Sequence, residues 1–108
     1  MRTYLGEFEQ LLLFALVELQ NDAYGGRIRQ AIEERTGRSL SPGAIYTALD
    51  RLETRKLVTS TLGDPTAQRG GKRKRYYRIE PEGLELLRRS HDALTRMAQG
   101  FAPKLEMP

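Results

Sequence analysis

Lys and Arg side chains are concentrated in one short segment of the chain. Residues 65–79 contain no acidic residue and six basic ones, namely Arg69, Lys72, Arg73, Lys74, Arg75 and Arg78. This segment carries a charge of +6, whereas the residues before it and after it each carry −1, so it holds more than the whole net charge of +4. A basic segment on a nearly neutral chain is typical of a site for a polyanion. A solvated loop is the alternative interpretation, and the neighbouring elements must decide between the two.

The 108 residues offer few candidates for a catalytic or metal-binding site. The chain has no cysteine and a single histidine, His91, which excludes disulfides and disfavours a histidine-rich metal site. Gly70-Gly71-Lys72 lacks the spacing of a phosphate-binding loop, and no Ser/His/Asp or paired-carboxylate set converges. The longest apolar run, residues 11–17, is too short to cross a bilayer. We therefore expect a cytoplasmic protein that is not an enzyme, needs no cofactor and has no membrane segment.

The elements around the basic segment follow from apolar spacing and capping signals. Apolar residues repeat at helical spacing over residues 6–20 and again from about residue 23 to 36, with Asp22 as the expected N-cap and Gly37 just past the end. Ser41-Pro42 predicts the start of a third helix that ends near Arg55. Residues 57–62 and 75–79 have the pattern of a β-hairpin. A fourth helix is expected over 81–102, followed by a loose tail.

Three helices followed by a hairpin predict a mainly α fold of the winged helix-turn-helix type. We expect a DNA-binding domain over residues 1–80, a dimerisation helix over 81–102 packed on it, and the tail over 103–108. In this fold the second helix of the helix-turn-helix enters the major groove and the hairpin, or wing, meets phosphates. The recognition helix would use Ser41, Pro42, Gly43, Ala44, Tyr46, Thr47 and Arg51. The wing would use Arg69, Gly70, Gly71, Lys72, Arg73, Lys74 and Arg75. For Tyr46 the alternative is packing against the wing, and for Arg51 it is pairing with a neighbouring acid.

Surplus apolar residues predict a second subunit. On the last helix they repeat at alternating spacings of three and four, which is the pattern of a helix that packs on a partner. The first helix has apolar residues on more than its core face. The predicted interface comprises Leu13, Val17, Leu84, Leu87, His91, Leu94, Ala98 and Phe101.

Several of these segments resemble one known family. Residues 41–53, SPGAIYTALDRLE, resemble the recognition helix of PadR-type transcriptional regulators. Lys74–Ile79 with Glu82-Gly83 resembles that family's wing and helix start, and Ala23-Tyr24-Gly25 resembles its start of helix two. The resemblance spans residues 8–90. It departs at Arg55-Lys56, where the family usually has Gly, and at Glu80, where it usually has Thr.

The resemblance implies a dimeric bacterial repressor that binds double-stranded operator DNA and responds to small molecules. The single helix after the wing is similar to that of the short subfamily, which dimerises through it. We expect a palindromic operator, and a small apolar or aromatic effector between the subunits. A winged helix used for protein interaction and an RNA-binding winged helix are the alternatives. The basic wing disfavours the first, because protein interfaces are depleted of Lys.

Overall fold

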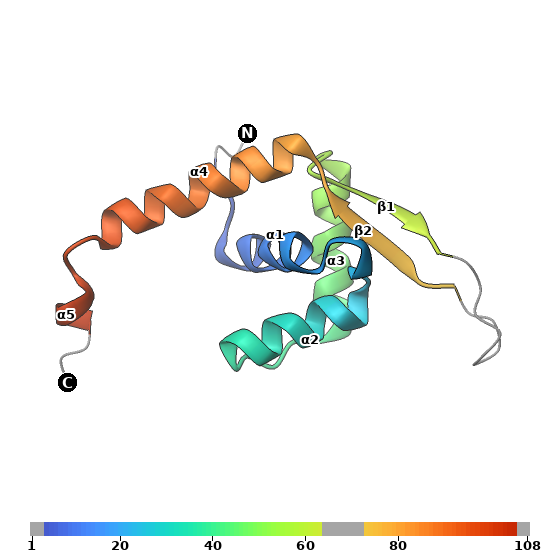
Figure 1. The fold of residues 1–108 in the computed structure, drawn as a ribbon, viewed down its shortest axis with the longest axis horizontal. Helices are drawn as coiled ribbons and strands as arrows, with labels where there is room; N and C mark the ends of the chain where they lie inside the picture. The colour runs from blue at the N-terminus through green and yellow to red at the C-terminus, as the bar shows by residue number, and fades with distance from the viewer. Residues whose placement is uncertain (1–3, 64–72, 106–108) are drawn as a thin grey trace.

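The fold consists of helices around a small core, with a β-hairpin projecting from one end (Figure 1). A computed structural model describes residues 4–63 and 73–105. The elements are α1 (Glu7–Leu19), the 3₁₀ turn η1 (Gln20–Asp22), α2 (Gly25–Thr36), α3 (Pro42–Thr54), β1 (Val58–Leu62), β2 (Arg75–Ile79), α4 (Pro81–Ala98) and α5 (Ala102–Leu105). The predicted winged helix-turn-helix architecture is confirmed.

Capping residues set the start of α3 and the end of α2. The Ser41 hydroxyl accepts a hydrogen bond from the Ala44 amide at 3.1 Å, and Pro42 occupies the first position of α3, as predicted. Gly37 ends α2 with a left-handed φ of 72°. The prediction for Asp22 is wrong: it lies in η1, and Tyr24 is the N-cap of α2 without a side-chain hydrogen bond.

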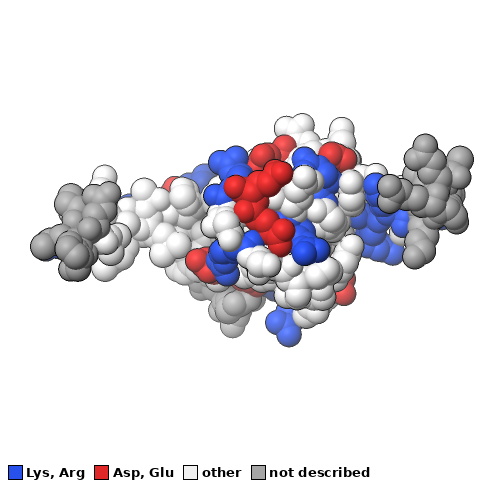
Figure 2. Space-filling view, turned by 90° about the horizontal axis from the view of Figure 1, so that it is seen from below, with Lys and Arg blue, Asp and Glu red and all other residues white. Residues whose placement is uncertain are grey.

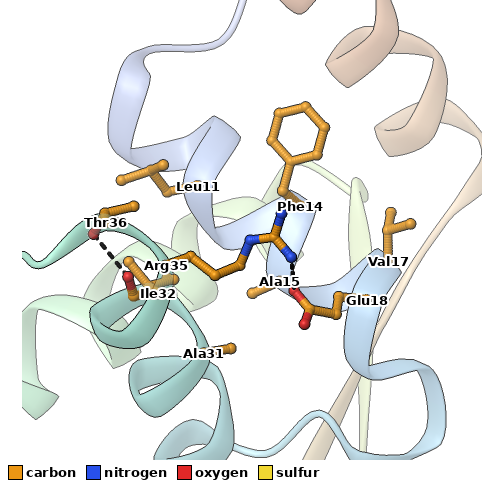
Figure 3. A pocket seen from close by; sticks show the side chains of 9 residues that line it. All are labelled: Leu11, Phe14, Ala15, Val17, Glu18, Ala31, Ile32, Arg35 and Thr36. Atoms are coloured by element: carbon orange, nitrogen blue, oxygen red, sulfur yellow. Dashed lines mark hydrogen bonds and ion pairs between the residues drawn. The ribbon is translucent and has the colours of Figure 1, made fainter.

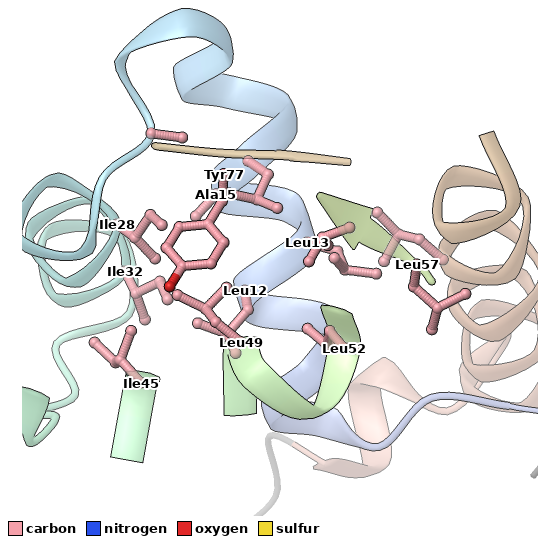
Figure 4. Packing of buried hydrophobic residues seen from close by; sticks show 14 of the residues in the cluster. Leu12, Leu13, Ala15, Ile28, Ile32, Ile45, Leu49, Leu52, Leu57 and Tyr77 are labelled. Atoms are coloured by element: carbon pink, nitrogen blue, oxygen red, sulfur yellow. The ribbon is translucent and has the colours of Figure 1, made fainter. Parts of the chain in front are cut away.

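The core lies where α1, α2, α3 and the hairpin meet (Figure 4). Its largest fully buried side chains come from all four of these parts, namely Leu12, Leu13, Ile28, Ile45, Leu49, Leu52 and Val58. Tyr77 of β2 inserts its ring among them, and burial raises the pKa of its phenol. The ring therefore attaches the hairpin to the helices.

The hairpin is antiparallel, with Val58 opposite Ile79 and Leu62 opposite Arg75. Its second strand also pairs with the segment between η1 and α2. The Tyr77 amide donates to the Ala23 carbonyl at 2.8 Å, and Tyr24 and Tyr76 form an isolated bridge. The base of the wing is thus joined by backbone hydrogen bonds to the start of the helix-turn-helix.

The first half of α4 packs on the body and the second half projects beyond it (Figure 1). Leu87 is only 3% exposed, and the Ser90 hydroxyl accepts from the Leu5 amide at 2.8 Å. Leu13 is fully buried as well. The expectation that Leu13 and Leu87 are exposed and await a second subunit is therefore wrong, since both already pack in the chain's own core.

The last predicted helix is also shorter than expected. It ends at Ala98 instead of continuing to residue 102, and Gly100 follows with a φ of 83°. The separate short helix α5 occupies the start of the tail that was expected to be loose.

Candidate nucleic-acid interface

The outer face of α3 is polar and open to solvent. All the residues predicted for the recognition helix are exposed, from Ser41 at its N-cap to Arg51 in its last turn. The apolar residues Ile45, Leu49 and Leu52 point the other way, into the core. No side chain of the described part of the chain lies within 4 Å of a Cβ built on Gly43. The N-terminal end of α3 therefore has room for close approach by a large ligand.

Tyr46 is 45% exposed and lies against the start of α2. A Cβ built on Gly25 would overlap the Tyr46 hydroxyl and lie 2.8 Å from its Cε1. The ring therefore occupies space that only a glycine at position 25 leaves free. Tyr46 thus packs on α2, a contact that the sequence did not suggest, and the DNA contact expected for its exposed part stays a prediction.

The described part of the wing carries cations that have no acidic partner. Arg73, Lys74 and Arg75 are exposed, and within residues 4–63 and 73–105 none of them forms an ion pair. Arg73 donates to the Gly63 carbonyl at 3.0 Å, and Arg75 donates to the Ser60 hydroxyl at 3.1 Å. The other predicted wing residues, Arg69, Gly70, Gly71 and Lys72, lie outside the described residues.

Five arginines of the helical body, in contrast, are paired with carboxylates. Arg27, Arg29, Arg35, Arg38 and Arg55 each form an ion pair with a carboxylate, at 2.9–3.3 Å. Figure 2 shows the result, with red and blue atoms mixed over the middle of the molecule and blue atoms gathered beside the end that bears the wing. Three cations without an ion pair in the described residues, Arg73, Lys74 and Arg75, therefore lie together at the base of the wing.

The two parts of this interface meet at Tyr24 and Gly25. Gly25 contacts Tyr46 of α3, and the ring of the adjacent Tyr24 lies 4.0 Å beneath the Lys74 ammonium. Sequence reasoning did not assign Tyr24 to the interface. The available signal was its place in the Ala23-Tyr24-Gly25 segment, directly before a helix that lacks a conventional cap.

The turn between α2 and α3 is held by a carboxylate. Glu33 accepts from the Leu40 amide at 2.9 Å and from Arg29 at 3.2 Å. The Leu40 amide and then the Arg29 guanidinium lower the pKa of Glu33. The ionised carboxylate therefore ties the turn before α3 to α2.

An apolar groove lies between α1 and α2, away from the wing (Figure 3). Its volume is about 430 Å³, and Ala15 and Ala31 leave it hollow because neither side chain extends beyond Cβ. Phe14 and Val17 stand along its α1 side. Arg35 reaches across from α2 to pair with Glu18 at 3.3 Å.

Exposed apolar side chains extend from this groove along α4. Phe14 and Val17 on α1 are each more than 40% exposed, and the rings of Phe14 and His91 of α4 pack edge to face at a centroid distance of 5.3 Å. Leu84, Leu94 and Phe101 are exposed, as are Met97 and Leu105. His91 and Ala98 are exposed too.

The described residues hold no group of three or more His, Cys, Asp or Glu that could bind a metal ion. Within the same residues, no helix combines the length and apolar character needed to span a membrane.

A recognition helix with a polar outer face, followed by a basic wing, defines the class of winged-helix DNA-binding proteins. Residues 12–89 match the transcriptional regulator PadR-like family. The match covers most of the chain, so the chain belongs to this family, and its members are transcriptional regulators and not enzymes.

Two relatives are similar in sequence. An uncharacterized 37.1 kDa protein in transposon TN4556 of Streptomyces fradiae is 36% identical over 98 residues, which cover 91% of this chain and 25% of that protein. A protein X of Lysinibacillus sphaericus is 35% identical over 84 residues, which cover 76% of this chain and 72% of that protein. The chain thus spans about a quarter of the first relative and most of the second.

Solved structures agree on the fold. A PadR family transcription regulator from Clostridium difficile has a TM-score of 0.71 at 26% identity, covering 91% of this chain and 98% of that one. A PadR-like regulator from Bacillus cereus has a TM-score of 0.72 at 24% identity, covering 94% and 93%. F93 from STIV, a winged-helix DNA-binding protein, has a TM-score of 0.71 at 18% identity, covering 90% and 97%.

Proposed function

We propose that this regulator is a homodimeric repressor that acts in the cytoplasm and binds an inverted-repeat DNA operator. One observation carries the proposal: the exposed polar face of α3 and the unpaired cations of the wing flank the same point, Tyr24-Gly25. Duplex DNA presents base edges in its major groove between two rows of phosphates. The α3 helix can enter the major groove, and the wing cations beside it can then meet the phosphates that border the groove.

Each predicted residue has a role in this proposal. The small residues Ser41, Pro42, Gly43 and Ala44 allow the start of α3 to approach the base pairs, and Thr47 reads a base edge with its hydroxyl or methyl group. Tyr46 in the second turn of α3 and Arg51 in its last turn reach the sides of the groove. Arg73, Lys74 and Arg75, together with Arg69 and Lys72 on either side of Gly70-Gly71, neutralise phosphates independently of sequence.

The homodimer is supported by the exposed apolar residues of α1 and α4. Phe14 and Val17 form a ridge on α1. The projecting half of α4 carries Leu94, which is 57% exposed, and Phe101 follows the end of α4 and is 45% exposed. Leu84, His91 and Ala98 continue this face of α4. A two-fold interface would bury both ridges at once. Two symmetric recognition helices then require half-sites about 10 base pairs apart, or a multiple of that spacing.

Repression would follow from occupation of the operator, and an effector would reverse it. The groove between α1 and α2 supports a small apolar or aromatic effector, because it is lined mainly by apolar side chains and lies beside the α1 ridge. A ligand there would shift α1 relative to α2, and thereby change the distance between the two recognition helices of the dimer.

Footprinting on the DNA upstream of the protein's own gene tests the operator, since regulators of this type commonly control adjacent genes. We expect protection of an inverted repeat that is weakened by salt and is not competed by RNA. Competition by RNA at equal concentration would favour the RNA-binding alternative. Absence of salt-sensitive binding to any duplex would refute the proposal and favour a protein-interaction module.

Sedimentation equilibrium tests the dimer. The wild type should be dimeric at micromolar concentration, and Leu94→Glu should be monomeric with unchanged helical circular dichroism. Glu82→Gln, on the exposed first turn of the same helix, is the control and should remain dimeric. A monomeric wild type that still binds its operator tightly would contradict the dimer.

A further inference from the structure

Three side chains form an aromatic corner at the base of the wing: Tyr24, Tyr76 and Lys74. The rings of Tyr24 and Tyr76 meet edge to face, with a centroid distance of 5.6 Å and an interplanar angle of 73°. The Lys74 ammonium lies 4.0 Å from the centroid of the Tyr24 ring. This distance is well within the range of a cation–π interaction.

The backbone holds the corner in place. The hydrogen bond from Tyr77 to Ala23 and the Tyr24–Tyr76 bridge fix β2 against the residues before α2. Directly after β1, a Cβ on Gly63 would lie 2.6 Å from Cε1 of Tyr76, so the ring uses the space that a glycine leaves. The Gly63 amide also donates to the Lys74 carbonyl at 2.7 Å. The backbone positions from which the Tyr76 ring and the Lys74 side chain extend are therefore fixed by hydrogen bonds.

The corner places a cation beside the recognition helix. Tyr24 immediately precedes Gly25, on which Tyr46 of α3 packs. Lys74 has a long flexible side chain that would otherwise sample many directions, and no ion pair within the described residues restrains it. The Tyr24 ring reduces that freedom without neutralising the charge, because the ammonium keeps hydrogen atoms free to donate.

We propose that Tyr24 is a positioning residue for DNA binding, whose ring holds the Lys74 ammonium next to α3 so that it contacts one backbone phosphate. This inference rests on the proposed function, since it assumes that the wing binds duplex DNA. Tyr24 lies outside both the recognition helix and the wing, and in this proposal it aligns the wing with the helix. The contact is to phosphate, so any duplex can report it.

The experiment is a double-mutant cycle with a short fluorescein-labelled duplex of mixed sequence, followed by fluorescence anisotropy over a salt series. Lys74→Gln should lower the slope of log K against log salt by about 0.9, the value for one phosphate contact. Tyr24→Leu should weaken binding about two- to fivefold, the range of an exposed cation–π interaction. Tyr24→Phe should bind as the wild type does, because it keeps the ring.

The double variant separates positioning from simple structural support. Tyr24→Leu should cost nothing further in the Lys74→Gln background, since the ring then has no cation to hold. Lys104→Gln is the matched control, because Lys104 also lies over a ring, that of Phe101 at 5.7 Å, but at the opposite end of the molecule. It should leave the affinity and the slope unchanged.

A measurement on the unaltered protein removes any dependence on the folding of Tyr24→Leu. In the wild type the ε-methylene protons of Lys74 should be shifted upfield by the ring current of Tyr24. Two results would overturn the inference: ordinary chemical shifts for the Lys74 ε-methylene protons, or losses of DNA affinity that add fully in the double-mutant cycle. Salt-sensitive DNA binding by the wild type would still support the proposed function in that case. A wild type that binds no duplex would overturn both.

Discussion

Replacing Gly25 by alanine should weaken DNA binding without unfolding the protein. A Cβ at this position meets only the outer end of the Tyr46 side chain, with Cζ at 2.5 Å and Cε1 at 2.8 Å. The ring is 45% exposed, so it can rotate outward into solvent. The substitution therefore displaces Tyr46 from its seat on α2 and leaves the backbone as it is.

The expected magnitudes follow from these contacts. Alanine at a compatible helical position restrains the unfolded chain and adds about 0.4–1 kcal/mol of stability, which offsets the lost packing of the ring. The free energy of unfolding should then change by less than about 1 kcal/mol. If Tyr46 makes a good contact to DNA, its displacement should cost about 1–3 kcal/mol of binding, or about fivefold to 150-fold in Kd.

The assay pairs urea denaturation, followed by circular dichroism, with fluorescence anisotropy on the footprinted duplex. Gly83→Ala is the control, because its Cβ would overlap the Leu57 carbonyl oxygen, a backbone atom that already accepts from Glu80. Since a backbone cannot rotate away, that variant should lose about 1–3 kcal/mol of stability. In a Tyr46→Ala background, Gly25→Ala should have no further effect on binding. Unchanged DNA affinity in Gly25→Ala would refute the role of Tyr46, and unfolding like that of Gly83→Ala would make Tyr46 a fixed core residue.

Three other predictions concern the wing, α4 and the helix-turn-helix. Arg73→Gln and Arg75→Gln should each lower the salt slope of DNA binding by about 0.9, and an unchanged slope would make them solvated surface residues. Leu87→Ala should lose about 2–5 kcal/mol in urea denaturation, because the side chain is buried in its own chain, whereas Leu94→Ala should affect only the dimer in sedimentation. Ionised Glu33 stabilises the fold above its ordinary pKa of 4.5, and this contribution is lost as the pH falls through its lower native pKa. Glu33→Gln should therefore reduce the fall in Tm below about pH 4.5. If Tm falls with pH in this variant as it does in the wild type, other carboxylates cause the fall.

Local signals in the sequence placed most of the elements to within a few residues. Ser41 and Pro42 start α3, and Gly37 ends α2, because these residue types satisfy or omit the backbone groups that a helix terminus leaves free. The end of α4 was placed four residues too late, at 102 instead of Ala98. Ala98 to Phe101 continue the apolar spacing, and spacing alone carries no information on where the backbone leaves the helix.

Burial was predicted less reliably than secondary structure. Leu87 and Leu94 occupy equivalent positions in the repeat along α4, yet Leu87 is 3% exposed and Leu94 is 57% exposed. The difference arises because the first half of α4 packs on the body of the molecule, whereas its second half projects beyond it (Figure 1). Leu13 shows the same effect on α1, where surrounding elements cover more of the helix than one apolar stripe.

The sequence by itself determined the order of the elements, the polar face of α3 and the concentration of positive charge after β1. These properties depend on neighbouring residues, whose propensities and charges are independent of the rest of the chain. Only the tertiary structure decided that Tyr46 packs on Gly25 and that Lys74 lies over Tyr24. Tyr24 and Lys74 are joined by the register of β2 against the start of α2, and a register between distant segments is fixed by the shared core that Tyr77 enters rather than by either segment alone.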